Sequence, residues 1–429
     1  MSNPPVTPTE RLYKIVQDGM CVGCGLCQSI AGPDTIRVAR VENGYERPVV
    51  TGTLDHETMD RIEDVCPGKR LEGLPPELQN ANTQMDMVWG PYQSMALAYA
   101  TDPEVRFKGS KGGVLTALGQ YLIDTKKVVF ILHVKQSGTY ATFGERHESH
   151  SAADVLDGAG SRYGPAAPLV DVLEVLDRGQ PFAFVGKPCD ISALRNLARH
   201  DPRVNELVKY WLTPVCGGFM PPQDMTRFLR QKYDVENEAL TEYRFRGHGC
   251  PGKMRFATKD GEAQEFRYTD FWGTDQSMWT LPFRCKVCPD GIGEAADIAA
   301  SDTWPGGSPD PSTEDDDLGT NAVIARTKAG LDLLNAAQEA GYVTVENECN
   351  PRYLDEVQPH QTKKKLAVLA RFEGLRAEGH TVPRAVGLRL DELKATLSDE
   401  DYKWQFDGAR ERVRVGKASE PTPKLWERQ

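Results

Sequence analysis

The sequence lacks the features that mark membrane, secreted and nucleic-acid-binding proteins. In its 429 residues no window approaches ~20 consecutive apolar residues, which argues against a membrane-spanning helix. The N-terminal segment MSNPPVTPTERLYK has no apolar stretch of the kind that signal peptides carry, so we expect a cytoplasmic protein. Positive charge is also in short supply, because 51 Lys and Arg face 62 Asp and Glu. The net charge of −11 disfavours nucleic acid as a partner.

Internal repeats and the usual nucleotide fingerprints are missing as well. No repeat of ~20–50 residues is visible, and no separate NAD-binding motif is found, which disfavours direct use of nicotinamide. What the sequence does have is ten cysteines. Without an export signal disulfides are not expected. Eight of the ten form two spaced groups, as two four-thiolate metal sites would require: Cys21, Cys24, Cys27 and Cys66, then Cys189, Cys216, Cys285 and Cys288.

The first group predicts a 4Fe-4S cluster. Cys21, Cys24 and Cys27 form the C-x2-C-x2-C run of ferredoxins, and Cys66-Pro67 is the natural fourth ligand. Zinc or unrelated buried thiols are the alternatives, but zinc sites usually pair a C-x2-C with a second one or with histidine. The spacing therefore favours the cluster.

The second group is dispersed and leaves a metal site open when it is taken alone. Cys285 and Cys288 have a chelating C-x2-C spacing, whereas Cys189 and Cys216 each follow a strand-like run. Two cysteines remain. We expect Cys349 to be an inert thiol. Cys250, in RGHGCPGK, is an active-site thiol, an alternative ligand or a loop residue, and the last is slightly favoured.

Residue patterning predicts an α/β protein, α+β overall. Asn43-Gly44 marks a hairpin in a small cysteine-bearing module, Asp55 is expected to cap a helix that leads to Cys66, and residues 74–86 read as a linker. Strands alternate with helices from about residue 91, and 240–280 is rich in strand signals. Residues 310–319 form an acidic loop. After about residue 355 the chain reads as charged, helical and without recognisable chemistry.

A glycine-rich turn precedes one of these helices. The residues Gly109, Ser110, Lys111, Gly112 and Gly113 lead into VLTALGQYLIDT. Main-chain N–H groups at a helix start can hold a phosphate or a flavin, and Lys111 could add charge. Taken alone, such a turn is more often structural.

Six segments together resemble a known family. The cluster motif, GSKGGVLTAL, SRYGPA, VGKPCDISALRNLAR, VCGGFM and RCKVCPDGIGEAADIAASDTW occur in the order found in the beta subunits of coenzyme F420 hydrogenases and dehydrogenases. That family also includes plant 7-hydroxymethyl-chlorophyll a reductase and ferredoxin-dependent 8-vinyl reductases. The resemblance runs from about residue 20 to at least 330.

The resemblance implies FAD and one or more 4Fe-4S clusters. It assigns Cys189, Cys216, Cys285 and Cys288 to an inner cluster, and it places the glycine-rich turn and Ser161, Arg162 and Tyr163 beside the FAD. The expected organisation is a ferredoxin-like iron–sulfur module (1–90), the first part of a flavin-binding domain (91–175), a catalytic domain with the second cluster (176–350) and a helical C-terminal region (351–429).

These parts predict an iron–sulfur flavoprotein oxidoreductase. Electrons from a ferredoxin-like donor would pass through two clusters to FAD and on to a small organic substrate. The candidates for a proton donor are His133, Lys187, Asp190, His248 and Asp302. The first hypothesis is a stand-alone reductase, as a homo-oligomer or otherwise. The alternative is an electron-relay subunit that exchanges electrons with a deazaflavin and binds a partner oxidoreductase subunit.

Overall fold

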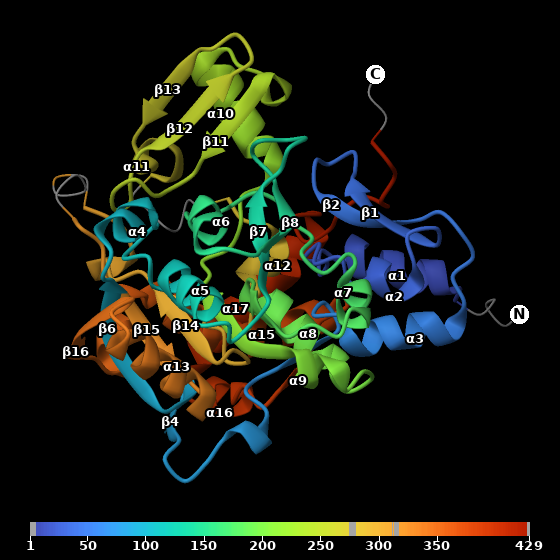
Figure 1. The fold of residues 1–429 in the computed structure, drawn as a ribbon. Helices are drawn as coiled ribbons and strands as arrows, with labels where there is room; N and C mark the ends of the chain where they lie inside the picture. The colour runs from blue at the N-terminus through green and yellow to red at the C-terminus, as the bar shows by residue number, and fades with distance from the viewer. Residues whose placement is uncertain (1–5, 274–279, 311, 313–316, 427–429) are drawn as a thin grey trace, which may run out of the picture.

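The protein is built around one eight-stranded mixed sheet. The computed structural model describes residues 6–273, 280–310, 312 and 317–426 (Figure 1). Its four central strands run parallel, and the outer strands on both sides pair antiparallel. In spatial order the strands are β16 (Val343–Glu348), β6 (Ser94–Ala100), β15 (Asn321–Ala325), β14 (Ile298–Ser301), β10 (Val208–Pro214), β9 (Phe182–Val185), β7 (Phe130–Gln136) and β8 (Gly144–Ser149).

Helices cover both faces of this sheet. Phe130 and Leu132 of β7 share a core with α7 (Val172–Asp177) and α8 (Pro188–Leu197). Ile131, which points to the other face, packs in the core that contains α5 (Val114–Asp124) and α13 (Lys328–Glu339). Strands buried on both faces have continuous apolar sequences. The two such runs, KVVFILHV and PFAFVG, are confirmed as central strands.

The N-terminal module packs beside this sheet. It contains α1 (Pro8–Gln17), α2 (Leu26–Ala31), β1 (Ile36–Arg40), β2 (Glu46–Val50) and α3 (His56–Val65). The hairpin predicted at Asn43-Gly44 is confirmed, with Gly44 at a φ of +82°. Asp55 caps α3 as predicted and accepts the N–H of Thr58 at 2.7 Å. The predicted linker holds η1 (Pro76–Leu78) and β4 (Gln84–Asp86), and β4 pairs with β5 (Gly90–Tyr92).

A second, smaller sheet projects from the main body. Its antiparallel strands are β11 (Leu240–Arg244), β12 (Met254–Thr258) and β13 (Ala263–Phe266). They lie at the top of Figure 1, beside α10 (Pro222–Tyr233) and α11 (Tyr268–Trp272). Aromatic side chains such as Tyr243, Phe256 and Phe266 fill the core between them. The strand signals of 240–280 are thus confirmed, apart from 274–279, which lie outside the described residues.

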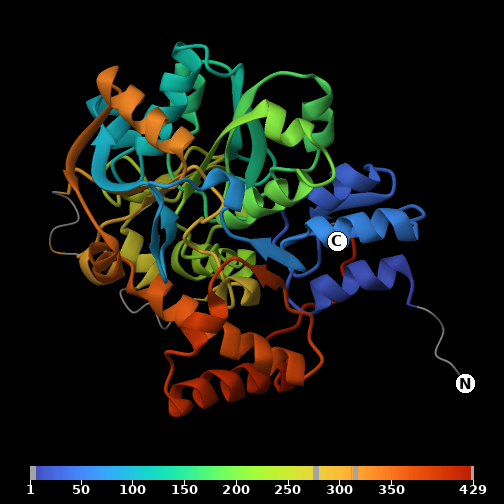
Figure 2. The same ribbon diagram turned by 90° about the horizontal axis from the view of Figure 1, so that it is seen from below.

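The C-terminal region returns to the N-terminal module. It consists of α14 (Pro351–Val357), α15 (Pro359–Ala377), β17 (Arg384–Val386), α16 (Leu390–Lys394) and α17 (Asp399–Arg414), as the helical prediction requires. Strand β17 pairs in parallel with β3 (Arg70–Glu72), and Leu12, Met59 and Leu375 share one core. In Figure 2 the red C-terminal helices lie next to the blue N-terminal module. The expected ranges 91–175 and 176–350 share the large sheet, because β6 of the first range pairs with β15 and β16 of the second.

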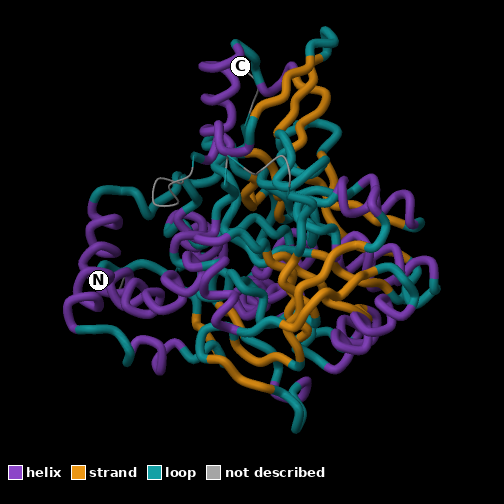
Figure 3. Tube along the Cα trace, turned by 90° about the vertical axis from the view of Figure 1, so that its left-hand side faces the viewer, coloured by secondary structure: helices purple, strands orange, loops and turns teal. Residues whose placement is uncertain are grey.

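The remaining elements are short and connect the larger ones: α4 (Pro103–Lys108), α6 (Ala152–Asp157), α9 (Arg203–Leu207), η2 (Asn237–Ala239), α12 (Phe283–Lys286) and η4 (Pro305–Gly307). Figure 3 shows the strands of the large sheet flanked by helices and the strands of the small sheet at the top of the molecule. In the described part of the chain, no helix combines the length and the apolar character needed to cross a membrane.

Candidate functional site

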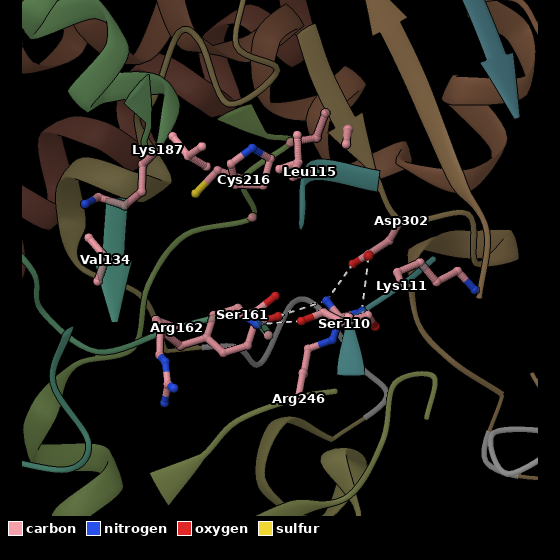
Figure 4. A pocket seen from close by; sticks show the side chains of 18 of the residues that line it. Ser110, Lys111, Leu115, Val134, Ser161, Arg162, Lys187, Cys216, Arg246 and Asp302 are labelled. Carbon is pink, nitrogen blue, oxygen red and sulfur yellow. Dashed lines mark hydrogen bonds and ion pairs between the residues drawn. The ribbon is translucent and has the colours of Figure 1, made fainter. Parts of the chain in front are cut away.

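A cavity of about 310 Å³ opens at the carboxyl ends of the parallel strands. Val134 in β7, Gly186 after β9, Val215 after β10 and Asp302 after β14 line it (Figure 4). Ligands of α/β proteins bind at this edge of the sheet. The volume lies at the lower end of the range usual for cofactor and substrate pockets. This cavity is therefore the candidate ligand site.

The predicted glycine-rich turn forms one wall of the cavity. Four of its five residues line it: Gly109, Ser110, Lys111 and Gly113. Gly113 has a φ of +72°, and a Cβ atom there would lie 2.7 Å from the carbonyl oxygen of Val105, so only glycine fits. Gly112 packs against Asn321, whose side-chain oxygen accepts the N–H of Val114 at 3.3 Å. Helix α5 begins at Val114, so its positive end faces the cavity.

Arg246 ties three of the predicted segments together. Its Nη1 and Nη2 donate to the two carboxylate oxygens of Asp302 at 2.9 and 3.1 Å. Nη2 also donates to the carbonyl oxygen of Ser110 at 2.7 Å, and Nη1 donates to the hydroxyl of Tyr163 at 3.1 Å. Burial lowers the pKa of Arg246, but Asp302 outweighs burial and the pKa lies well above its ordinary value. The sequence did not single out Arg246, because nothing distinguishes it from Arg244 in YRFRG.

The SRYGPA segment supplies the opposite wall. The N–H of Ser161 donates to the hydroxyl of Ser110, and Arg162 donates to the carbonyl oxygen of Tyr243 at 2.9 Å. The Nε atom of Arg162 is buried and has no hydrogen-bond partner in the part of the chain that the structure describes. Burial lowers the pKa of Arg162.

Four of the five predicted proton-donor candidates line the cavity: His133, Lys187, Asp190 and Asp302. Lys187 donates to Asp190 at 2.7 Å, so these two side chains form a pair. The fifth candidate, His248, does not line the cavity. It is exposed, and its ring lies against Phe107, with 5.4 Å between the ring centroids.

His133 gives the protein a testable dependence of stability on pH. Burial lowers its pKa to about 4, and Nε2 shares a 2.7 Å hydrogen bond with the hydroxyl of Ser149. The unfolded chain binds a proton near pH 6.5, so the free energy of unfolding falls as the pH drops from 6.5 towards 4. When the pH is lowered from 7.5 to 5, the free energy of unfolding should fall by ~2 kcal/mol less in His133→Gln than in wild type. Urea unfolding at the two pH values measures this. An equal loss in both proteins would contradict this.

The C-terminal region contributes to the cavity, contrary to the expectation that it carries no chemistry. His360, in the first turn of α15, lines the cavity, and burial lowers its pKa to about 3, so that it is neutral at pH 7. Gln361 donates to the carbonyl oxygen of Cys216 at 2.8 Å, and Gln358 donates to that of Asp302 at 3.0 Å. The segment PHQTKKK contains no motif that would have identified these residues.

The first four cysteines gather as the sequence predicted. Cys21, Cys24, Cys27 and Cys66 line one apolar cavity of about 30 Å³. Cys24 interacts electrostatically with Cys27 and Cys66, and Cys21 interacts with Cys27 and Cys66. Helix α3 ends at Val65 and so brings Cys66 to the motif.

The four cysteines assigned by resemblance also gather. Cys189 lies in the first turn of α8, Cys216 follows β10, and Cys285 and Cys288 lie at α12. Cys189 interacts electrostatically with Cys216 and Cys288, and Cys216 interacts with Cys285 and Cys288. Cys216 also lines the large cavity.

Both groups have the chemistry that iron–sulfur clusters need. Burial raises the pKa of Cys66 and of Cys216 to about 12, so a bound cationic centre would be needed to hold either sulfur as a thiolate. Within the described ranges, no three His, Cys, Asp or Glu side chains lie close enough to hold a single metal ion; a cubane spreads its ligands over four irons. Main-chain N–H groups donate to sulfurs in both groups: Gly23 to Cys21, Gly68 to Cys66 and Gly218 to Cys216.

The two cysteine groups are neighbours. Asp190 interacts electrostatically with both Cys24 and Cys189. Arg284, next to the C-x2-C pair, donates to the carbonyl oxygen of Pro67 at 3.2 Å. The cavity, the second group and the first group thus follow one another through the protein.

The two remaining cysteines join neither group. Cys250 is buried and donates to Asp317 at 3.2 Å, and Lys111 pairs with the same carboxylate. Asp317 belongs to the predicted acidic loop, of which 311 and 313–316 lie outside the described residues. Cys349 packs at the edge of an apolar core, and burial raises its pKa to about 12, as an inert thiol requires.

Comparison with known sequences identifies the family. Residues 95–174 match the N-terminal domain, and residues 179–350 the C-terminal domain, of the coenzyme F420 hydrogenase/dehydrogenase beta subunit. The chain belongs to this family. The resemblance drawn from the six segments is thereby confirmed.

Three curated relatives share 24% to 27% sequence identity with this chain. The beta subunit of F420-dependent formate dehydrogenase 1 from Methanococcus maripaludis is 27% identical over 61% of this chain and 63% of its own length. The coenzyme F420-dependent sulfite reductase of Methanocaldococcus jannaschii is 24% identical over 76% of this chain, which spans about half (47%) of that protein. The coenzyme F420 hydrogenase beta subunit of Methanococcus voltae is 24% identical over 64% of this chain and 89% of its own.

A solved structure shares the fold. A chain of the F420-reducing [NiFe] hydrogenase complex of Methanosarcina barkeri superposes with a TM-score of 0.53, at 19% identity, over 70% of this chain and 98% of that one. The relatives are named as hydrogenase, dehydrogenase and reductase proteins, so an oxidoreductase role in electron transfer is supported.

Proposed function

We propose that this protein is the electron-relay subunit of an F420-linked oxidoreductase. A redox ring would bind in the 310 Å³ cavity, and two 4Fe-4S clusters held by the eight cysteines would connect it to a partner subunit. The observation that carries this proposal is the position of Cys216, which lines the cavity and also belongs to the second cysteine group. Electron transfer from the cavity to that group therefore needs no intervening structure.

The residues of the cavity suit a flavin such as FAD. The N–H groups of Leu115 and Thr116 in the first turn of α5 would hold its phosphate, because that of Val114 is taken by Asn321, and Arg162 would be a further donor. Arg246 and Asp302 hold the surrounding segments in place, and the neutral His360 and the Lys187–Asp190 pair border the space for the ring. Bound there, a flavin would convert two-electron hydride transfer into the single-electron steps of iron–sulfur clusters.

The comparisons favour the relay subunit over the stand-alone reductase. The curated relatives are named for coenzyme F420, and three of those described above are beta subunits or members of hydrogenase and dehydrogenase assemblies. None of these names supports a ferredoxin donor or an organic substrate. We therefore propose a deazaflavin coenzyme and a partner oxidoreductase subunit as the two electron-exchange partners, with FAD between them.

Anaerobic spectroscopy tests this function. The purified chain should contain about eight irons, as two cubane clusters require, and should release FAD on denaturation. Addition of reduced coenzyme F420 should bleach the cluster absorption within seconds. Full bleaching by dithionite but none by reduced F420 would overturn the F420 link. An iron content well below eight would overturn the two-cluster relay.

A further inference from the structure

The C-terminal tail, residues 415–426, packs along the N-terminal module. In Figure 1 this red segment lies beside β1 and β2. The N–H of Glu420 donates to the carbonyl oxygen of Gln17 at 2.9 Å, and Leu425 forms an antiparallel bridge with Val41. The tail therefore follows the module from the end of α1 to the loop of the hairpin.

A buried ion pair joins this tail to the hairpin. Nε and Nη2 of Arg47, in β2, donate to the two carboxylate oxygens of Glu420 at 2.8 and 2.7 Å. Asn43, in the hairpin loop, donates to the same carboxylate at 3.2 Å. The side chain of Arg47 is 1% exposed and that of Glu420 is 12% exposed. Because both charges are shielded from solvent, salt and water screen them little.

The positive side of this pair faces the first cysteine motif. Nη1 of Arg47, the nitrogen that Glu420 does not bind, would lie 3.4 Å from a Cβ atom on Gly23, a residue of the C-x2-C-x2-C run. The same nitrogen donates to the carbonyl oxygen of Glu46 at 2.9 Å, which holds it there. Pro48, the next residue of β2, lines the apolar cavity of the first cysteine group. In such surroundings a charge acts more strongly than at the protein surface.

We propose that the Arg47–Glu420 pair sets the reduction potential of the centre held by the first cysteine group, termed the first centre. The proposal rests on the proposed function, because it needs a redox centre there. Reduction adds one electron, and so one negative charge, to that centre without forming or breaking a bond. The charge of Arg47 stabilises the reduced state, and the carboxylate of Glu420 opposes it. Both residues lie outside the matched ranges 95–174 and 179–350, so the pair is an addition to the shared fold.

Anaerobic redox titration with dithionite, followed by EPR spectroscopy, tests the pair in the full chain. The signal that disappears in Cys66→Ala identifies the first centre. At a fixed potential near the wild-type midpoint, Glu420→Gln should raise the ratio of reduced to oxidised first centre ~10-fold, which for one electron is an upward shift of about 59 mV. Arg47→Gln should shift the midpoint downward by a similar amount. The double variant R47Q/E420Q, which removes both charges, should lie between the two.

Two further variants separate charge from packing. Glu265→Gln removes the same charge from an Arg–Glu pair on the small sheet, where Glu265 lies 3.1 Å from Arg244, and its ratio should stay within ~1.5-fold of wild type. Arg47→Lys keeps the positive charge but loses the forked geometry, so its midpoint should lie closer to wild type than that of Arg47→Gln.

The direction of the shifts decides the question. Shifts of the same sign in Glu420→Gln and Arg47→Gln would mean that loss of tail packing, and not charge, moves the potential, and would overturn the proposal. Unmoved midpoints in both variants, or an equal shift in Glu265→Gln, would overturn it while leaving the proposed function standing. Wild type that holds only the second centre would overturn the two-cluster relay itself, and this proposal with it.

Discussion

Replacement of Cys66 by alanine is expected to halve the iron content, from about eight to about four atoms per chain. Cys66 reaches the first group only because α3 ends at Val65, and the other three ligands lie on one short loop. With three thiolates left, a cubane loses one corner and becomes labile. The second group shares no ligand with the first, so its four irons should stay. Iron and acid-labile sulfide analysis measures this directly.

Cys349→Ala is the matched control for this experiment. Cys349 is also partly buried, and burial raises its pKa to about the same value as that of Cys66, yet it packs only at the edge of an apolar core. The control should keep all eight irons. Full iron in Cys66→Ala, or an equal loss in Cys349→Ala, would show that the first group does not hold a cluster.

The sequence predicted those features that arise from neighbouring residues. The C-x2-C-x2-C spacing, the Asn43-Gly44 hairpin and the Asp55 cap each depend on a few consecutive positions, and the local chemistry of each allows few alternatives. The two runs KVVFILHV and PFAFVG were equally clear, because a central parallel strand is buried on both faces. At the hairpin, the helix cap and the two central strands, the local sequence pattern was therefore enough to predict the structure.

Features that depend on the path of the chain were harder to predict. Cys189 and Cys216 are brought together by adjacent parallel strands, and residue spacing alone left their pairing open. The six ordered segments supplied what the spacing could not. Whether these cysteines bind a cluster stays a prediction.

The places of Arg246 and His360 in the cavity could not be predicted from the sequence. Arg246 matters because its guanidinium meets Ser110, Tyr163 and Asp302, which lie far from it in the sequence. His360 reaches the cavity only because α14 and α15 turn back against η4 and the end of β14. Neither contact leaves a periodic or spaced pattern, so only the folded structure reveals them.

The second large effect is expected for Arg246→Met. This substitution leaves the Asp302 carboxylate, the Ser110 carbonyl and the Tyr163 hydroxyl without their shared donor. Removal of one partner from a buried ion pair costs ~3–5 kcal/mol; Asp302 keeps 27% side-chain exposure, which places the cost at the lower end. We expect the urea midpoint to fall accordingly and flavin affinity to drop at least ~100-fold, because two walls of the cavity lose their common anchor.

Arg244→Met separates this role from a general loss of charge. Arg244 lies two residues earlier, at the end of β11, and pairs with Glu265 at 3.1 Å on the small sheet. Its replacement removes the same charge and adds the same side chain, yet the cavity keeps every contact, so flavin affinity should stay within ~2-fold and stability within ~1 kcal/mol. Arg246→Lys keeps the charge but not the two parallel hydrogen bonds to Asp302, and should recover only part of the affinity. Full recovery by lysine would mean that charge alone, and not the forked geometry, organises the cavity.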